Sequence, residues 1–269
     1  MQAMTDLTKR ITVPEFAAKK RRGEKLCMLT AYDYSMAALL DRSGVDAVLV
    51  GDSLGMVVQG KSTTVPVTLD QIIYHAEMVV RAVSRALVVV DMPFLTCNVS
   101  VERSIENAGR ILQETGCQAV KLEGGAEQAQ VISALVSAGI PVMAHVGLRP
   151  QYVHVMGGYR VQRDAEQLLR DANAAEAAGA FSILLECIPA TVAAKITSTL
   201  AIPTIGIGAG KECDGQVLVI HDLLGLGGGY LPRFVRQYAD LGSAVTEAVG
   251  RFAADVRTGR FPGPAESYD

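Results

Sequence analysis

Short apolar runs alternate with longer amphipathic stretches along almost the whole chain of 269 residues. The runs are rich in β-branched residues and end at Gly, Asp or Glu, which is typical of strands buried on both faces of a parallel sheet. The stretches between them have the length and spacing of helices. Strands are therefore predicted over residues 26–29, 45–50, 87–90, 119–122, 142–144, 183–185 and 202–207.

Helix start and stop signals support this alternation. The segments that begin at Thr12 (Thr-Val-Pro-Glu) and Thr68 (Thr-Leu-Asp-Gln) have the form of capping boxes, and the first predicts a helix before the first strand. The Ala-rich residues 164–178 predict another helix. Glycines that follow helical patterns and precede strands are expected to end those helices, and they are Gly116, Gly139 and Gly179.

The eighth unit is ambiguous. Residues 215–224 have the β-branched content of a strand, but we interpret them as a helix with Asp214 as N-cap and Gly225 as C-cap. The seventh strand otherwise lacks a return crossover. The eighth strand is then expected at 234–238, after a mobile loop at 227–229, and a last helix around 242–257.

This order of elements, without a linker or a composition break, predicts one (β/α)₈ TIM-barrel domain over residues 1–269. A doubly wound open sheet is the alternative. Hydrophobic residues make up 49% of the chain and charged residues 20%, as in ordinary globular proteins.

Charge and cysteine content narrow the class of function. The net charge of −3 and the absence of a long basic run argue against nucleic-acid or membrane-surface binding. No apolar run approaches the roughly 18 residues of a membrane span, and no signal segment opens the chain. The five cysteines include no C-x-x-C pair, so we expect a reducing, cytoplasmic location.

Polar residues gather at the ends of the predicted strands. In a (β/α)₈ barrel these ends meet at one mouth, which is where the active site lies. Chance placement of so many acids directly after apolar strands is improbable. The first strand runs toward Tyr32, and the later strands lead into Asp52 and Ser53, Asp91, Glu123, His145 and Glu186.

Lys121 and Glu123 lie two positions apart on one strand, so their side chains point to the same side. A buried Lys requires anionic partners, which the carboxylates and an anionic substrate supply. Clustered carboxylates without Cys ligands favour Mg²⁺ before Zn²⁺. A 2-oxo acid offers two oxygens that chelate such an ion.

Several segments resemble the ketopantoate hydroxymethyltransferase family, in order and over nearly the whole chain. The Gly-Asp-Ser-Leu-Gly segment with the later Lys-Leu-Glu-Gly-Gly is specific, whereas any one piece alone is not. Arg149 and Arg160 depart from the expected pattern, in which Thr or Ser and Lys respectively are usual, and these departures concern the substrate loop. The matching segments are residues 30–34, 50–56, 121–125, 145–148, 157–159, 185–187 and 205–210.

The resemblance implies transfer of the one-carbon unit of 5,10-methylenetetrahydrofolate to 3-methyl-2-oxobutanoate, giving 2-dehydropantoate, in cytosolic pantothenate and coenzyme A biosynthesis. It implies Mg²⁺ as cofactor, Glu186 as proton acceptor and a homodecamer. By matching position, Asp52 and Asp91 look like metal ligands, with Glu123 completing the metal environment. The 2-oxo acid is then expected to bind Asp52, Ser53, Asp91 and Lys121, with His145 and Tyr32 in supporting roles.

Three other functions remain open at this point. A metal-dependent lyase or mutase of the isocitrate lyase and phosphoenolpyruvate mutase kind shares the fold and acids, but such enzymes carry a reactive Cys loop motif that this chain lacks. A Schiff-base aldolase would use Lys121. A non-catalytic barrel that binds a partner would not need acids at every strand end.

Overall fold

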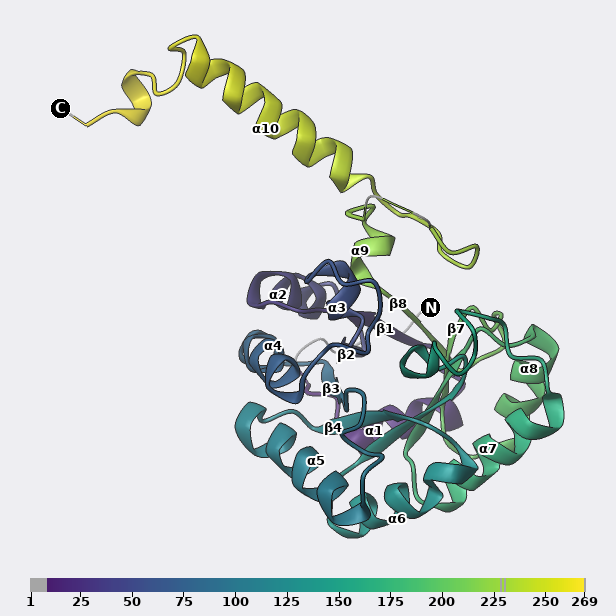
Figure 1. Cartoon of the computed structure of the whole chain (residues 1–269). Helices are drawn as coiled ribbons and strands as arrows, with labels where there is room; N and C mark the ends of the chain where they lie inside the picture. Colours follow the sequence, from purple (N-terminus) through teal and green to yellow (C-terminus); the bar gives the residue numbers. More distant parts are fainter. Residues whose placement is uncertain (1–8, 228, 230, 269) are drawn as a thin grey trace. The chain divides into compact units, whose positions relative to one another are not determined.

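The computed structural model describes residues 9–227, 229 and 231–268, and its contacts divide the chain into two units after Val219. The first unit is a closed barrel of eight parallel strands in sequence order, surrounded by helices (Figure 1). The predicted (β/α)₈ fold is therefore confirmed. That residues 1–269 form one domain stays a prediction.

Seven strands lie where the apolar runs predict them, within a few residues at their ends. The strands are β1 (Leu26–Thr30), β2 (Ala47–Val50), β3 (Leu87–Asp91), β4 (Ala119–Glu123), β5 (Val142–Gly147), β6 (Ser182–Glu186), β7 (Thr204–Ile207) and β8 (Gly215–Leu218). The helices of this unit are α1 (Val13–Arg21), α2 (Tyr34–Arg42), α3 (Leu54–Val57), α4 (Leu69–Ala82), α5 (Val101–Thr115), α6 (Ala129–Ser137), α7 (Ala165–Ala177) and α8 (Ala190–Thr199), with 3₁₀ turns η1 (Ala126–Gln128) and η2 (Pro150–Tyr152).

The prediction for the eighth unit is wrong for the strand, although residues 220–223 are helical as predicted and Gly225 after them has a φ of 66°. Residues 215–218 form β8, which pairs with β7 and β1 and closes the barrel, whereas residues 234–238 form no strand. A seven-residue connection such as 208–214 reaches about 23 Å when extended, and a four-residue strand is only about 13 Å long, so no crossover helix is needed. Asp214 is not a helix N-cap, because its Oδ2 accepts from the Thr204 N–H at 2.9 Å.

The helix signals are confirmed. The Thr12 side chain accepts from the Glu15 N–H at the start of α1, and Thr68 and Gln71 form a complete capping box at the start of α4. The helices predicted over 164–178 and 242–257 are α7 and α10 (Leu241–Arg257). The glycines expected to end helices adopt the left-handed backbone that glycine tolerates, with φ of 75° at Gly116, 85° at Gly139 and 98° at Gly179.

Apolar side chains fill the N-terminal half of the barrel, and α1 packs on that end. Phe16 of α1 is fully buried and its ring contacts Phe181 edge-to-face, with centroids 5.9 Å apart. Two positions further along the same strands the inward side chains become charged, for example Asp91 after Val89. This alternation places a polar layer at the C-terminal mouth of the barrel.

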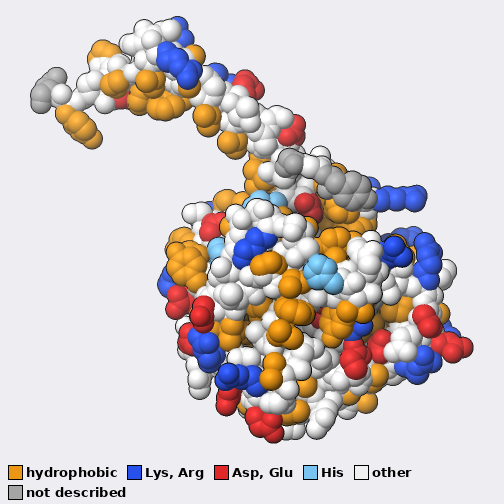
Figure 2. All heavy atoms as spheres, viewed as in Figure 1, with side chains coloured by type: hydrophobic (Ala, Val, Ile, Leu, Met, Phe, Trp, Pro, Cys, Tyr) orange, Lys and Arg blue, Asp and Glu red, His pale blue; other side chains and the backbone are white. Residues whose placement is uncertain are grey.

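The second unit contains α9 (Ile220–Leu223), α10 and η3 (Pro264–Glu266). Within it, the Tyr238 N–H donates to the Leu223 carbonyl at 2.8 Å. Hydrophobic side chains gather along α10 (Figure 2), and none of its residues is buried. The mobile loop predicted at 227–229 includes residue 228, which lies outside the described residues. No described helix has the length and apolar content needed to cross a membrane.

Candidate active site

The barrel brings the predicted site residues together at its C-terminal mouth. Asp91 is the register partner of Lys121, and Glu123 is the register partner of His145, so β3, β4 and β5 present them at neighbouring positions. All four of these side chains are at most 5% exposed. The remaining members lie after β1 (Tyr32), after β2 (Asp52 and Ser53) and at the last residue of β6 (Glu186).

Lys121 lies at the centre of the polar layer. Its Nζ is 3.0 Å from Asp91 Oδ1 and forms a 3.2 Å hydrogen bond with His145 Nδ1. Burial alone would lower the pKa of Lys121, but the neighbouring carboxylates, led by Asp91, outweigh burial and raise the pKa above its usual value. Lys121 is therefore held protonated, which suits it to bind an anionic substrate group and not to act as a Schiff-base nucleophile.

Asp52 and Asp91 are close neighbours. The Asp52 backbone N–H donates to Asp91 Oδ2 at 2.9 Å. Burial, and then the negative charge of Asp91, raise the pKa of Asp52 to about 7. Burial, and then the negative charge of Asp52, also raise the pKa of Glu123 well above its usual range. The mouth thus concentrates negative charge that one lysine only partly balances.

Gln151 links two of these acids, and sequence reasoning missed it. Its Nε2 donates to Asp52 Oδ2 at 2.8 Å, and its backbone N–H donates to Glu123 Oε2 at 3.1 Å. Gln151 lies in η2, directly after β5, and is 5% exposed. In the sequence, only its position after a barrel strand points to a place in the site, because a single Gln belongs to no motif with a characteristic spacing.

Tyr159 also belongs to the mouth, although the sequence indicated it only as part of a family segment. Burial, followed by the charges of Asp52, Glu186 and Glu123, raises the pKa of Tyr159. Its ring is half exposed, and its hydroxyl lies 3.6 Å from Met56 Sδ. Tyr159 therefore lies near the acid cluster, in the loop between η2 and α7.

His145 lies between Lys121 and Glu186. Because protonated Lys121 only donates, His145 Nδ1 accepts and the ring proton of the neutral imidazole is on Nε2. Burial, and then the charge of Lys121, lower the pKa of His145 well below its usual value, so the ring is neutral. His145 Nε2 is 3.1 Å from Glu186 Oε2 but lacks hydrogen-bond geometry toward any described residue.

Glu186 has the properties of a general base. Burial raises its pKa to about 7, while the charge of Lys121 opposes this rise. A carboxylate with this pKa is near half ionisation at neutral pH, where it can both accept and return a proton.

Tyr32 supports Ser53 on the opposite side of the mouth. The Tyr32 hydroxyl and Ser53 Oγ are 2.8 Å apart, and burial raises the pKa of Tyr32. The carbonyl of Tyr32 lies 2.7 Å from His75 Nδ1 of α4. This contact gives His75 a structural role.

The donor set fits a hard divalent cation. In the part of the chain that is described, no three His, Cys, Asp or Glu side chains surround a common metal position. Mg²⁺, however, is commonly held by one or two carboxylates, with waters and substrate oxygens in the other positions. Asp52 and Asp91 are adjacent, and among the described residues the buried Asp91 Oδ1 has only the Lys121 ion pair as a partner. These two acids fit such an ion, with Glu123 nearby.

Comparison with known proteins identifies relatives over nearly the full length. The family model described as ketopantoate hydroxymethyltransferase matches residues 10–264. The 3-methyl-2-oxobutanoate hydroxymethyltransferase of Rhodopirellula baltica is 57% identical over 260 residues, which is 97% of each chain. The protein of the same name from Pelobacter propionicus is 53% identical and covers 99% of this chain and 100% of its own.

Solved structures with similar architecture share little sequence. Phosphonopyruvate hydrolase in complex with oxalate and Mg²⁺ has a TM-score of 0.62 at 13% identity and covers 94% of this chain and 89% of its own. A 2,3-dimethylmalate lyase, a member of the PEP mutase/isocitrate lyase superfamily, has a TM-score of 0.59 at 17% identity, with 94% and 90% covered. At this identity the likeness shows the barrel fold alone.

Proposed function

This chain belongs to the ketopantoate hydroxymethyltransferase family, and from that premise we propose that it transfers the one-carbon unit of 5,10-methylenetetrahydrofolate to 3-methyl-2-oxobutanoate, giving 2-dehydropantoate. The observation that carries the proposal is the match to relatives of that name over 97% of the chain. The geometry of the mouth supports the roles that we propose below for the predicted residues.

The first step is substrate binding. The protonated Lys121 amine neutralises the substrate carboxylate, and Ser53 and the Asp52–Asp91 pair surround the oxo acid. Asp52 and Asp91 would hold Mg²⁺, with Glu123 completing the metal environment, and the ion would supply positive charge that favours loss of the C3 proton from the bound oxo acid. Because the mouth is largely buried, these charges act with little screening by water.

Glu186 then removes the proton from C3 of the oxo acid, the carbon next to the ketone. The electron pair of the broken C3–H bond forms the new bond from C3 to the methylene carbon of the donor. The carbon–nitrogen bonds of that methylene break, the tetrahydrofolate nitrogens take up protons, and water supplies the hydroxyl oxygen of the product. Neutral His145, between Lys121 and Glu186, keeps the cation and the base apart.

The decisive experiment is exchange of the C3 proton of 3-methyl-2-oxobutanoate in heavy water with magnesium and without folate. Glu186→Gln keeps the shape of the side chain and removes its basicity, so exchange is expected to fall by about 10²-fold or more. Calorimetric binding of the oxo acid is expected to change little. Glu166→Gln, on the exposed face of α7, makes the same chemical change away from the mouth and is the control. Equal exchange in wild type and Glu186→Gln would remove Glu186 from its role.

The cellular setting follows from the same proposal. We place the enzyme in the cytoplasm, in pantothenate and coenzyme A biosynthesis, and assign it small-molecule substrates. A homodecamer is proposed as its assembly, supported by the exposed apolar side chains of α10.

A further inference from the structure

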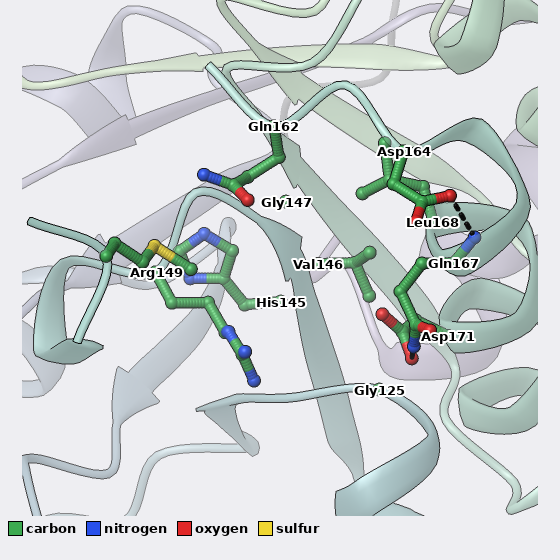
Figure 3. Close-up of a pocket in the computed structure, with 11 residues that line it drawn as sticks. Gly125, His145, Val146, Gly147, Arg149, Gln162, Asp164, Gln167, Leu168 and Asp171 are labelled. Atoms are coloured by element: carbon green, nitrogen blue, oxygen red, sulfur yellow. Dashed lines mark hydrogen bonds between the residues drawn. The ribbon is translucent and has the colours of Figure 1, made fainter. Parts of the chain in front are cut away.

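A pocket with a volume of about 90 Å³ opens beside His145, between the C-terminal end of β5 and the first turns of α7 (Figure 3). Its walls come from His145, Val146 and Gly147 of β5 and from Gln167, Leu168 and Asp171 of α7. Gly147 has a φ of 105°, and a Cβ there would lie 2.3 Å from the Glu186 carbonyl oxygen. Glycine at this position therefore lets β5 end close to β6.

The lining combines apolar and polar side chains. Val146 and Leu168 are buried hydrophobic residues that line it, and Met156 joins them from the loop before α7. Asp171 uses Oδ1 to accept from the Ala126 N–H at 3.1 Å and from Gln167 Nε2 at 2.8 Å. Among the described residues Oδ2 has no partner, so it can accept from a ligand. This is the lining that a planar heterocycle with N–H donors on one edge requires.

His145 connects the pocket with the reaction. Its imidazole is 2% exposed, it lines the pocket, and its Nε2 has no hydrogen-bond partner among the described residues. The same nitrogen lies 3.1 Å from Glu186 Oε2. A ligand in the pocket therefore lies against the imidazole whose Nε2 adjoins the proton acceptor.

We infer that this pocket binds the reduced pterin ring of the one-carbon donor, an assignment that rests on the proposed function. The 2-amino and N3–H groups of a pterin match the acceptor of Asp171. Its opposite edge carries N5, the nitrogen that bears the transferable carbon, and this edge lies toward His145. The carbon is thereby delivered to the side of the mouth that Glu186 occupies.

The pocket suits the ring better than the anionic aminobenzoyl-glutamate tail of the donor. Arg149 is the one cation among the lining residues, and its guanidinium already has partners within the protein. Its guanidinium forms an ion pair with Glu127 and lies 4.1 Å from the centre of the Tyr152 ring. The tail therefore extends away from the pocket toward solvent.

Gln167→Trp tests the assignment, because residue 167 is exposed at the pocket wall and an indole there occupies the space of a ring. The KM for 5,10-methylenetetrahydrofolate is expected to rise by about tenfold or more. Folate-independent C3 exchange is expected to persist, which also reports that the barrel is folded. Glu166→Trp adds the same bulk on the adjacent, solvent-facing position of α7 and is expected to leave both parameters unchanged.

A second measurement uses 6-methyltetrahydropterin, which has the ring and no tail. It is expected to inhibit the wild type competitively against the folate and to lose this effect in Gln167→Trp. An unchanged folate KM in Gln167→Trp, or inhibition by aminobenzoyl-glutamate but not by the pterin, overturns the assignment. Failure of the proposed function is distinguishable, since the wild type would then show no C3 exchange and no folate-dependent transfer.

Discussion

The burial that gives Glu186 its basicity has a cost in stability. Its pKa rises from the usual 4.5 to about 7 on folding, so the folded state binds this proton more tightly than the unfolded state. The stability it contributes is complete below about pH 4.5 and is lost as pH rises through about 7. The metal-free protein should therefore gain stability when this charge is removed.

We predict that Glu186→Gln raises the free energy of unfolding at pH 8 by about 1–3 kcal/mol, because each unit of pKa difference corresponds to about 1.4 kcal/mol. Urea unfolding in a chelator at pH 8 and pH 4.5 measures the effect, which is expected at the higher pH only. Glu166→Gln removes an exposed carboxylate, so its effect on the free energy of unfolding should be the same at pH 8 and at pH 4.5. A pH-independent difference for Glu186→Gln would contradict the shifted pKa.

Which site residues the sequence reveals depends on where they lie. Asp91, Lys121, Glu123 and Glu186 are on strands, where the two-residue period and the shared direction of parallel strands determine which end and which face they occupy. Gln151 reaches the same acids from a 3₁₀ turn. Nothing in the spacing of a turn residue indicates where its side chain points, so this member was found only in the folded structure.

At the scale of elements, β8 shows the limit of pattern reasoning. Its four residues, Gly-Gln-Val-Leu, are too few to distinguish a strand from the start of a helix by periodicity. Their assignment depends on pairing with β1 and β7, which are nearly 190 and 10 positions away in sequence. The other strands were predictable because their apolar runs are flanked by clear helix signals, whereas β8 contains Gly215 and Gln216.

Gly215 makes the closure of the barrel sensitive to a single methyl group. A Cβ there would lie 2.6 Å from the Leu26 carbonyl oxygen and 2.7 Å from Ile205 Cδ1. Gly215→Ala is expected to destabilise the protein by about 1–3 kcal/mol, since the backbone of β1 cannot move freely. Gly109→Ala is the matched control, because a Cβ in that part of α5 meets nothing within 4 Å.

The control should stabilise the protein by about 0.5–1 kcal/mol, the usual difference between Gly and Ala in a helix interior. Denaturant unfolding of both variants at one pH provides the comparison. If Gly215→Ala proved neutral, the tight β1–β8 contact would not exist in solution.

For the whole molecule, α10 bears on the assembly. Leu241, Val245, Val249, Phe252 and Val256 are spaced by four, four, three and four positions, which places them on one face of the helix. Each is between 37% and 59% exposed. A contiguous apolar face of this length is unusual on an isolated chain and marks a surface that another surface covers.

The proposed homodecamer requires this face to lie in an interface between copies of the chain. Val249→Asp places a charge at its centre and is expected to convert the assembly to smaller species, because an unpaired charge in an apolar interface is costly to bury. Ala254→Asp adds the same charge on the opposite, exposed side of α10 and should leave the assembly intact. Sedimentation velocity at matched concentration separates the two outcomes. If the wild type sediments as a monomer, the decamer is wrong. If the wild type is larger and both variants keep its sedimentation coefficient, the face of α10 does not lie in the interface between copies.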